Sequence, residues 1–274
     1  MNNQASIISS PMTVTELAIY PVKSTRQVTL GSAIIGSMGF EHDRRWMLVD
    51  SEGQFITQRK YPRLVLVTAT SVGSAIRLSA DGHDDLLVPE PGASAHVVDT
   101  RVWKDDCQGL DAGDAAAQWL SDFLKLDCRL IYMPENRIRA LDARYSQPGE
   151  RTGYADGFPF LLTTTASLDE LNARLDKPVP MKRFRPNIVV HAETPFAEDQ
   201  WQRIRIGSVT FRVAKPCSRC IMTTVDTERA VTGKEPLKTL SEYRRIDKGV
   251  IFGQNLIHES TGEIRVGDRV EVLD

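Results

Sequence analysis

Short apolar segments recur through the first hundred residues, separated by turn-forming residues and without the periodicity that suits a helix. Such segments, about 8–12 residues apart, are typical of β-barrels and sandwiches. The strands that we predict are residues 17–20, 45–49, 54–58, 64–68, 75–79, 86–88 and 96–103. Residues 50–53, Asp-Ser-Glu-Gly, have the composition of a hairpin turn between two of them. This part of the chain is therefore predicted to form a β-barrel-like domain.

A helix and a long polar connector follow this β-rich part. Apolar residues at helical spacing predict a helix over residues 114–126, and a strand is expected at residues 129–132. Residues 134–157 are polar and rich in turn-forming residues, so they are expected to connect two domains or to line a site. A domain boundary is placed in this connector. The two predicted domains are residues 14–140 and 141–274.

The second half is predicted to combine strands with two short helices. Ser167, with Glu170 three residues later, has the pattern of a capping box that opens a helix ending at Leu175. A second helix is expected at residues 237–244. The predicted strands are residues 160–163, 187–190, 203–206, 209–213, 221–225, 250–257 and 269–272. The whole chain is thus expected to be mostly β with some α.

The charge and the cysteine content exclude several classes of protein. The chain has 34 Lys and Arg against 36 Asp and Glu, so it lacks the basic field that favours a nucleic acid polymer. No apolar run is long enough to cross a membrane, and residues 1–10 lack the features of a secretory signal. Four cysteines in 274 residues do not make a disulfide framework. These features predict a reduced, cytoplasmic protein that does not act on membranes.

Reactive side chains are concentrated in residues 215–226, which read Lys-Pro-Cys-Ser-Arg-Cys-Ile-Met-Thr-Thr-Val-Asp. Cys217 and Cys220 fit four interpretations: ordinary thiols, half of a four-cysteine metal site, a redox pair, or one thiolate that binds a soft metal or acts as a nucleophile. A four-cysteine metal site needs a second cysteine pair, which the sequence does not have. The strand-like residues that follow Cys220 do not suit a redox pair, which usually opens a helix. Lys215 and Arg219 would stabilise a thiolate. The spacing alone does not choose among these interpretations.

Other basic residues lie at predicted turns rather than on regular faces. Each of them, taken alone, is an ordinary solvated loop charge. Together they could form a pocket for a phosphate, for which bidentate arginine is well suited. These residues are Lys23, Arg44, Arg45, Arg59, Lys60, Lys182, Arg183 and Arg185.

The motifs taken together resemble the MOSC domain, the module shared with the C-terminus of molybdenum cofactor sulfurase. Its signature is similar to residues 215–220 and 223–226, and two other landmarks match residues 184–187 and 252–254. An N-terminal β-barrel domain precedes MOSC in the mitochondrial amidoxime-reducing component and its bacterial relatives. The segments that resemble it are residues 20–24, 43–46 and 57–59. The resemblance spans roughly residues 14–272 and implies an N-terminal β-barrel-like domain followed by a MOSC β-barrel domain.

The resemblance also implies a cofactor and the residues that bind it. Family members bind the molybdopterin form of the molybdenum cofactor between the two domains, and Cys220 matches their thiolate ligand, which makes it the expected catalytic and metal-binding residue. A soft thiolate suits such a metal. For Ser167, contact with the pterin competes with its predicted part in the capping box. The residues that match positions holding the pterin or its phosphate are Lys23, Ser24, Arg44, Thr164, Thr165, Ser167, Arg185, Asn187, Ser218 and Arg219.

The activity implied by the resemblance is reduction of N-hydroxylated compounds such as hydroxylamino-purines and amidoximes, a detoxifying reaction. A ferredoxin-like domain with its own cysteine cluster is not found after MOSC, so the electrons are expected from a separate ferredoxin-, flavodoxin- or cytochrome b5-like carrier. Asp226 is a weak candidate for the general acid, because an Asp after a strand more often forms a turn. The alternative is a molybdenum cofactor carrier or a sulfur-transfer protein that uses a persulfide on Cys220.

The two cysteines of the pair are expected to differ. Residues three apart in an extended segment point to opposite faces, so only one of the thiols would face the metal if the segment is extended through Cys220. A tight turn between them would bring them together. We expect Cys220 to be the ligand and Cys217 to be a supporting thiol.

Overall fold

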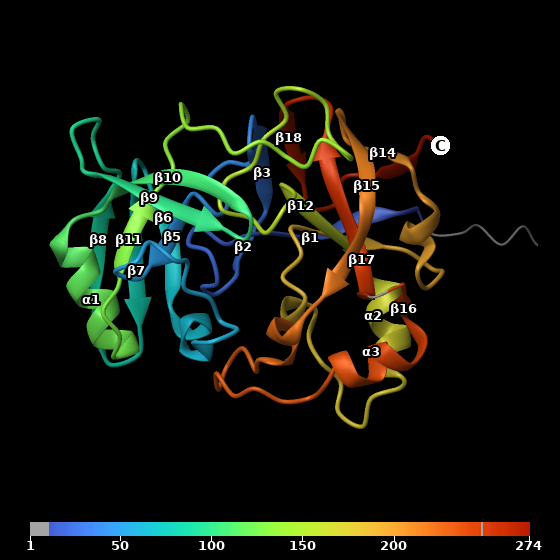
Figure 1. The fold of residues 1–274 in the computed structure, drawn as a ribbon. Coiled ribbons are helices and arrows are strands. Elements are labelled where there is room, and N and C mark those ends of the chain that lie inside the picture. Colours follow the sequence, from blue (N-terminus) through green and yellow to red (C-terminus); the bar gives the residue numbers. More distant parts are fainter. Residues whose placement is uncertain (1–10, 248) are drawn as a thin grey trace, which may run out of the picture.

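The computed structural model describes residues 11–247 and 249–274 (Figure 1). The expectation about a secretory signal concerns residues 1–10, which lie outside these residues. The described chain is rich in strands, with three α-helices among them, and this confirms the predicted mostly β fold class. None of its helices has the length and apolar character needed to cross a membrane.

The largest sheet joins both ends of the sequence. Its strand order is β19-β14-β15-β17-β12-β13-β1-β2, and β16 pairs with β17. Strand β1 lies antiparallel to β13, with Leu17 opposite Ile188. The start of the chain is therefore built into a sheet that otherwise comes from the second half. The strands are β1 (Thr13–Ile19), β2 (Val28–Leu30), β12 (Phe160–Thr164), β13 (Ile188–His191), β14 (Arg203–Ile206), β15 (Val209–Arg219), β16 (Arg245–Ile246), β17 (Gly249–His258) and β19 (Val270–Val272).

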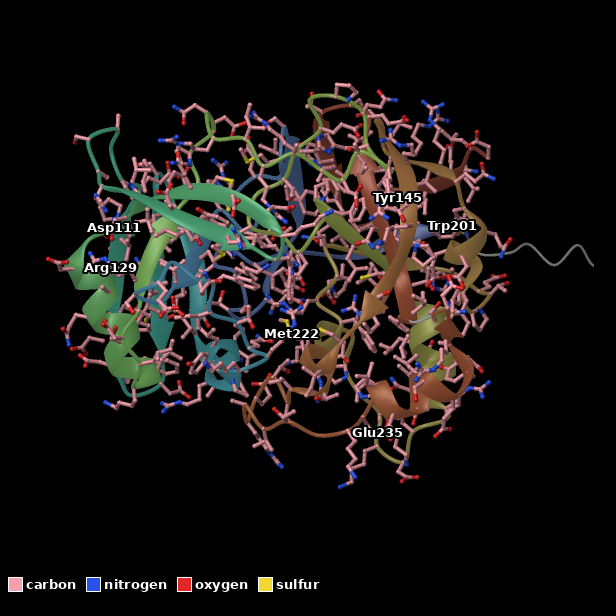
Figure 2. The ribbon with its side chains drawn as sticks, viewed as in Figure 1. Asp111, Arg129, Tyr145, Trp201, Met222 and Glu235 are labelled. Carbon is pink, nitrogen blue, oxygen red and sulfur yellow. The ribbon has the colours of Figure 1, made fainter. Side chains whose placement is uncertain are left out.

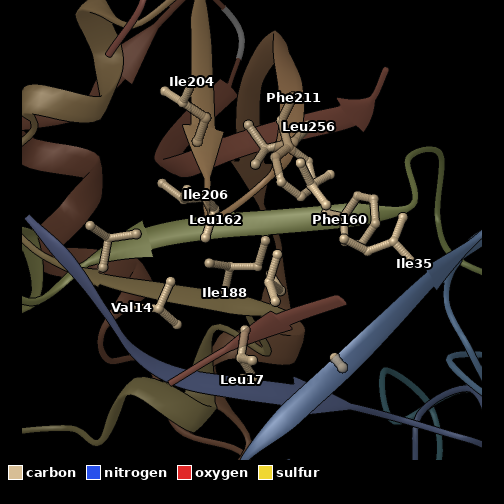
Figure 3. Packing of buried hydrophobic residues seen from close by; sticks show 14 of the residues in the cluster. Val14, Leu17, Ile35, Phe160, Leu162, Ile188, Ile204, Ile206, Phe211 and Leu256 are labelled. Atoms are coloured by element: carbon tan, nitrogen blue, oxygen red, sulfur yellow. The ribbon is translucent and has the colours of Figure 1, made fainter. Parts of the chain in front are cut away.

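Two apolar clusters cover this sheet, and they explain why its central strands read as continuous apolar runs. One cluster includes Leu17, Phe160, Leu162 and Leu256, all buried (Figure 3). The other includes Leu171 of helix α2 (Thr165–Asn172) and Leu240 of helix α3 (Leu237–Tyr243), together with Phe184 and Phe252. Every residue of β12 is buried, as expected of a strand that is covered on both faces.

Strands β5 to β11 and helix α1 form a second body, drawn at the left of Figure 1. Here β5-β11-β10-β9 and β6-β7-β8 make two sheets, and α1 packs on their shared core through Leu120 and Phe123. A small sheet, β18-β3-β4, contains strands from both ends of the sequence. The elements are β3 (Ser32–Gly36), β4 (Gly39–Phe40), β5 (Trp46–Val49), β6 (Thr68–Val72), β7 (Ala75–Ala80), β8 (His83–Pro89), β9 (Val97–Val102), β10 (Asp105–Asp111), α1 (Asp114–Leu124), β11 (Arg129–Tyr132) and β18 (Gly262–Arg265).

Three of the predicted strands are wrong. Residues 64–68 fall largely in a 3₁₀ helix at Pro62–Leu66, where Leu64 and Val65 are buried without strand pairing. Residues 54–58 make only isolated bridges, among them Val49 with Phe55. Residues 221–225 form a 3₁₀ helix at Ile221–Thr224. This last turn is held because the hydroxyl of Thr223 donates to the carbonyl oxygen of Cys220 at 3.0 Å. The prediction failed at these segments because apolar content does not distinguish a buried turn from a strand.

Candidate functional site

A cavity of about 310 Å³ is lined by residues from both halves of the molecule. Met222, one of its lining residues, lies where the two bodies meet in Figure 2. Such a volume is at the lower end of the range for small-molecule sites. The lining residues are Lys23, Ser24, Arg44, Arg59, Ala155, Asp156, Gly157, Phe158, Phe160, Leu161, Arg183, Phe184, Arg185, Asn187, Lys215, Cys217, Ser218, Arg219, Cys220, Met222 and Asn255.

The lining is strongly basic. Among the described residues that form it, Asp156 is the one carboxylate. It faces a large excess of cations within one concave surface, an arrangement that favours an anionic ligand and suits bidentate binding of phosphate. The sequence placed most of these cations in separate loops, and the fold brings them together. The cations are Lys23, Arg44, Arg59, Arg183, Arg185, Lys215 and Arg219.

Asp156 holds two of the cations in place. Its carboxylate pairs with Lys23 Nζ at 2.6 Å and with Arg59 Nη2 at 3.0 Å. Burial alone would raise the pKa of Asp156, but the charges of Lys23 and Arg59 outweigh it and lower that pKa. Burial also lowers the pKa of Lys23 to about 8, although Asp156 opposes this shift. The pair therefore keeps a buried ammonium next to an ionised carboxylate.

Both thiols of the cysteine pair line this one cavity. Arg219 Nη1 donates to Cys217 Sγ at 2.8 Å. Arg59 interacts electrostatically with Cys220; burial opposes protonation of Arg59, but Asp156 and this thiol raise its pKa. The condition for opposite orientation, a regular extended segment through Cys220, is not met, because the register of β15 against β17 shifts between Pro216 and Ser218 and breaks the strand alternation. The site thus offers two sulfur atoms, each beside a guanidinium group.

Three lining residues have a left-handed backbone: Ser24 at φ 72°, Arg44 at φ 49° and Arg185 at φ 57°. Such angles are uncommon outside glycine and persist where the surroundings impose them, as they do at binding sites. The guanidinium carbons of Arg44 and Arg185 lie 4.5 Å and 4.0 Å from the centroid of the Tyr20 ring. Burial lowers the pKa of Arg185 to about 10, which leaves it charged at neutral pH. Tyr20 therefore anchors two cations at the cavity wall.

Asn187 lines the cavity, but its side-chain amide is engaged with the protein. Its Nδ2 donates to the carbonyl oxygen of Ala18 and to Asp43, each at 3.1 Å. Its Oδ1 accepts from Arg44 Nη1 at 3.1 Å and from the backbone N–H of Leu161 at 3.3 Å. An amide has two donor hydrogens, and both are used here. The side chain thus positions Arg44 and joins the two halves.

Thr164, Thr165 and Ser167 do not line the cavity. Strand β12 reaches the cavity at Phe160, and each further residue lies about 3.3 Å further along the strand. Thr164, not Ser167, is the N-cap of α2, and it accepts from the N–H of Ser167 at 3.3 Å. The hydroxyl of Ser167 instead donates to the buried carboxylate of Glu198. The helix is therefore capped by a different residue from the one predicted, and with Ser167 at the third helical position it has no capping box.

Asp226 forms a turn, as its sequence context favoured. Its Oδ1 accepts from the backbone N–H groups of Glu228 and Arg229, each at 2.9 Å. These bonds lower the pKa of Asp226. An ionised turn residue outside the cavity lining does not suit the role of general acid.

Asp156 is the main site residue that the sequence did not indicate. The sequence marked residues 134–157 as a connector or a site-lining loop. The end of this loop, including Asp156, does line the cavity, and so does Phe158 just beyond it. Within that loop, Asp156 preceding Gly157 has the pattern of an ordinary turn. Its contacts with Lys23 and Arg59 depend on long-range packing, which no local pattern shows.

The lining of the cavity suits an anionic cofactor that carries a metal. Arg59 Nη1 and Arg219 Nε are buried and have no hydrogen-bond partner in the described chain. Buried N–H groups of this kind are rare because leaving one unpaired costs free energy. Unpaired guanidinium nitrogens beside two thiols match a group that carries both a phosphate and a thiophilic metal.

The fold and this basic, thiol-bearing cavity define the class of protein. The family model described as the MOSC N-terminal beta barrel domain matches residues 11–127, and that of the MOSC domain matches residues 149–271. The chain is 40% identical over 280 residues to mitochondrial amidoxime-reducing component 1 of Mus musculus, covering 95% of this chain and 82% of the relative. It is 38% identical over 281 residues to mitochondrial amidoxime reducing component 2 of Bos taurus, covering 94% of this chain and 82% of the relative. The chain belongs to the family of the mitochondrial amidoxime-reducing components.

The predicted cytoplasmic location is wrong, because these relatives are named as mitochondrial proteins. The prediction was based on a low cysteine content and on the lack of a secretory signal. Both features argue against an oxidising, secreted environment. Neither distinguishes between reducing compartments inside a cell.

Proposed function

We propose that the protein is a molybdenum cofactor-dependent oxidoreductase that reduces N-hydroxylated compounds such as amidoximes. The observation that carries this proposal is the meeting of two thiols and an excess of cations in one cavity. The relatives described above, named as amidoxime-reducing components, support the same activity. Hydroxylamino-purines are further proposed substrates, and detoxification is the proposed biological role.

We propose that Cys220 is the metal ligand. It ends the extended part of the cysteine segment and interacts with the guanidinium group of Arg59, one of the cations of the cavity. When bound, the cofactor supplies a redox-active metal, and the protein sets its ligand and its electrostatic surroundings. Cys217, held by Arg219, is proposed to support the site without ligating the metal.

The cations of the cavity are proposed to hold the phosphate and pterin of the cofactor. Lys23, Arg185 and Arg219 offer charge. Arg44 is fixed by its contact with Asn187, which limits its movement. Ser24 and Ser218 line the same cavity and offer hydroxyl groups. The assignment of Thr164, Thr165 and Ser167 to this role is not proposed, because they lie away from the cavity lining.

The proposed reaction takes two electrons and two protons and converts the N–OH group of an amidoxime into the N–H of an amidine plus water. We propose that the electrons come from a separate ferredoxin-, flavodoxin- or cytochrome b5-like protein. The division into domains of residues 14–140 and 141–274 is kept as a proposal. It assigns Lys23 and Cys220 to different domains that close on one site.

The test is to purify the protein from a host that makes the molybdenum cofactor and to measure metal, pterin and turnover. Bound molybdenum with reduction of benzamidoxime by an artificial electron donor supports the proposed enzyme. Bound cofactor that is passed intact to an apo-acceptor, without turnover, would instead support a carrier. Absence of both metal and pterin would refute the proposal.

A further inference from the structure

Trp103 occupies an unusual backbone position near the candidate site. It is the first residue of the two-residue turn between β9 and β10, where Val102 pairs with Asp105. Its φ is 58°, an angle that glycine adopts readily and that is an outlier for a bulky residue. Backbone strain of this kind persists where surrounding contacts impose it and is concentrated at functional sites.

Three contacts fix the indole ring. Its Nε1 donates to Asp156 Oδ1 at 3.3 Å. The Arg59 guanidinium carbon lies 4.5 Å from the ring centroid, and the Phe55 ring packs edge-on at 5.1 Å. Arg59 and Asp156 both line the cavity, so these contacts place the indole at its rim. The turn and the contacts together hold a large aromatic ring in one orientation.

The fixed ring is still accessible. Trp103 is 48% exposed, a large fraction for a tryptophan that makes three side-chain contacts. Two of its partners, Arg59 and Asp156, line the cavity, and the third, Phe55, packs against a neighbouring apolar cluster. A rigid, exposed indole beside a ligand cavity provides a flat apolar surface on which a conjugated ring can stack.

We propose that Trp103 is a specificity-determining residue that stacks on flat, conjugated N-hydroxylated substrates and favours them over aliphatic ones. This inference rests on the proposed function of the cavity. The N–OH group of either kind of substrate enters the cavity. The ring attached to it, where present, lies at the mouth against the indole. An aliphatic substrate such as acetamidoxime has no ring to place there.

The test compares benzamidoxime with acetamidoxime, using the cofactor-loaded enzyme and an artificial electron donor. Trp103→Leu should lower kcat/KM for benzamidoxime by about 3–10-fold, the range expected for loss of one aromatic pair. It should change kcat/KM for acetamidoxime by less than about 2-fold on the same reasoning. Trp103→Phe, which keeps a ring but loses the bond to Asp156, should retain most of the preference. Trp119→Leu alters a tryptophan stacked on Phe123 in α1 and serves as the matched control.

A binding measurement separates this inference from the proposed function. Calorimetric titration of the loaded protein with benzamidine, the expected product, should give a higher Kd in Trp103→Leu. The increase should match the factor lost in kcat/KM for benzamidoxime. This result stands on its own even if the wild type reduces neither substrate, an outcome that would refute the proposed function. Equal losses for both substrates, or an unchanged Kd for benzamidine, would overturn the stacking role. Equal losses only with a protein electron donor would also overturn it, since they would assign the indole to docking of the carrier.

Discussion

Arg139 provides a sharp test of how the cavity loop is held, because its side chain is only 2% exposed. Its Nη1 donates to the carbonyl oxygens of Gly153 at 3.0 Å and Ala155 at 2.5 Å. Its Nη2 donates to the carbonyl oxygen of Asp156 at 3.3 Å and pairs with Asp105 on β10 at 2.8 Å. One guanidinium group thus ties the segment that carries Asp156 to the second body.

The expected loss of unfolding free energy follows from the groups that Arg139→Met leaves without a partner. The substitution removes every one of these donors and strands three carbonyl groups and a carboxylate. Removing one partner of a buried ion pair costs about 3–5 kcal/mol. Asp105 is 33% exposed and regains some solvation, so the lower end, about 3 kcal/mol of unfolding free energy, is expected. Arg139→Lys keeps the charge but loses the planar set of guanidinium N–H donors. It should cost about 1–2 kcal/mol of unfolding free energy, equivalent to one or two lost hydrogen bonds.

The assay is urea-induced unfolding followed by tryptophan fluorescence, with the cofactor-free proteins compared under identical conditions. Arg144→Met is the control, because Arg144 pairs with Asp142 on the surface and should leave the unfolding midpoint unchanged. The loaded Arg139→Met protein should also retain less pterin, since the loop no longer holds Asp156 in position. A change below about 1 kcal/mol in Arg139→Met would refute the reasoning, because one buried pair alone is expected to exceed that value.

Three further predictions concern the site. Cys220→Ala should abolish benzamidoxime reduction and lower the molybdenum content, whereas Cys217→Ala should keep most of both; the reverse pattern in metal analysis and turnover would contradict the ligand assignment. The pKa of Lys23 is lowered to about 8 by burial, so its ammonium is present below that pH and lost above it. Pterin retained after gel filtration should therefore fall as pH rises through about 8, and Lys23→Met should retain little at any pH; retention independent of pH would argue against this anchor. Asp226→Asn should leave kcat/KM nearly unchanged, and a loss above tenfold would restore this residue as a catalytic candidate.

Regular elements with a strong period could be predicted from the sequence. Helix α1 begins at Asp114 as expected and stops at Leu124, two residues early, because Lys125 adopts a left-handed backbone with φ 55°. Strand β17 was also found because its apolar residues are buried on both faces. Strand β10 was missed, since Asp105–Asp111 is largely polar and is held by pairing with β9 rather than by burial. Period and burial are visible in a sequence, whereas the pairing of a largely polar strand with its neighbours is not.

The basic residues and the cysteines of the site could also be predicted, because they lie in motifs that are dense in charge and thiols. The orientation of Cys217 could not, since it depends on a register shift within β15. Asp156 could not be found either, because its importance comes from two partners far away in the sequence. The assignment of Thr164 followed a family position, whereas the part of β12 that lines the cavity is at Phe160 and Leu161.

Anomalous diffraction from the cofactor-loaded protein, recorded at the molybdenum absorption edge, tests the central claim most directly. The account predicts one strong peak inside the basic cavity and within bonding distance of Cys220 Sγ, with Lys23 and Arg185 on the surrounding wall. A peak bonded to Cys217 instead, or a peak outside the cavity, would contradict it.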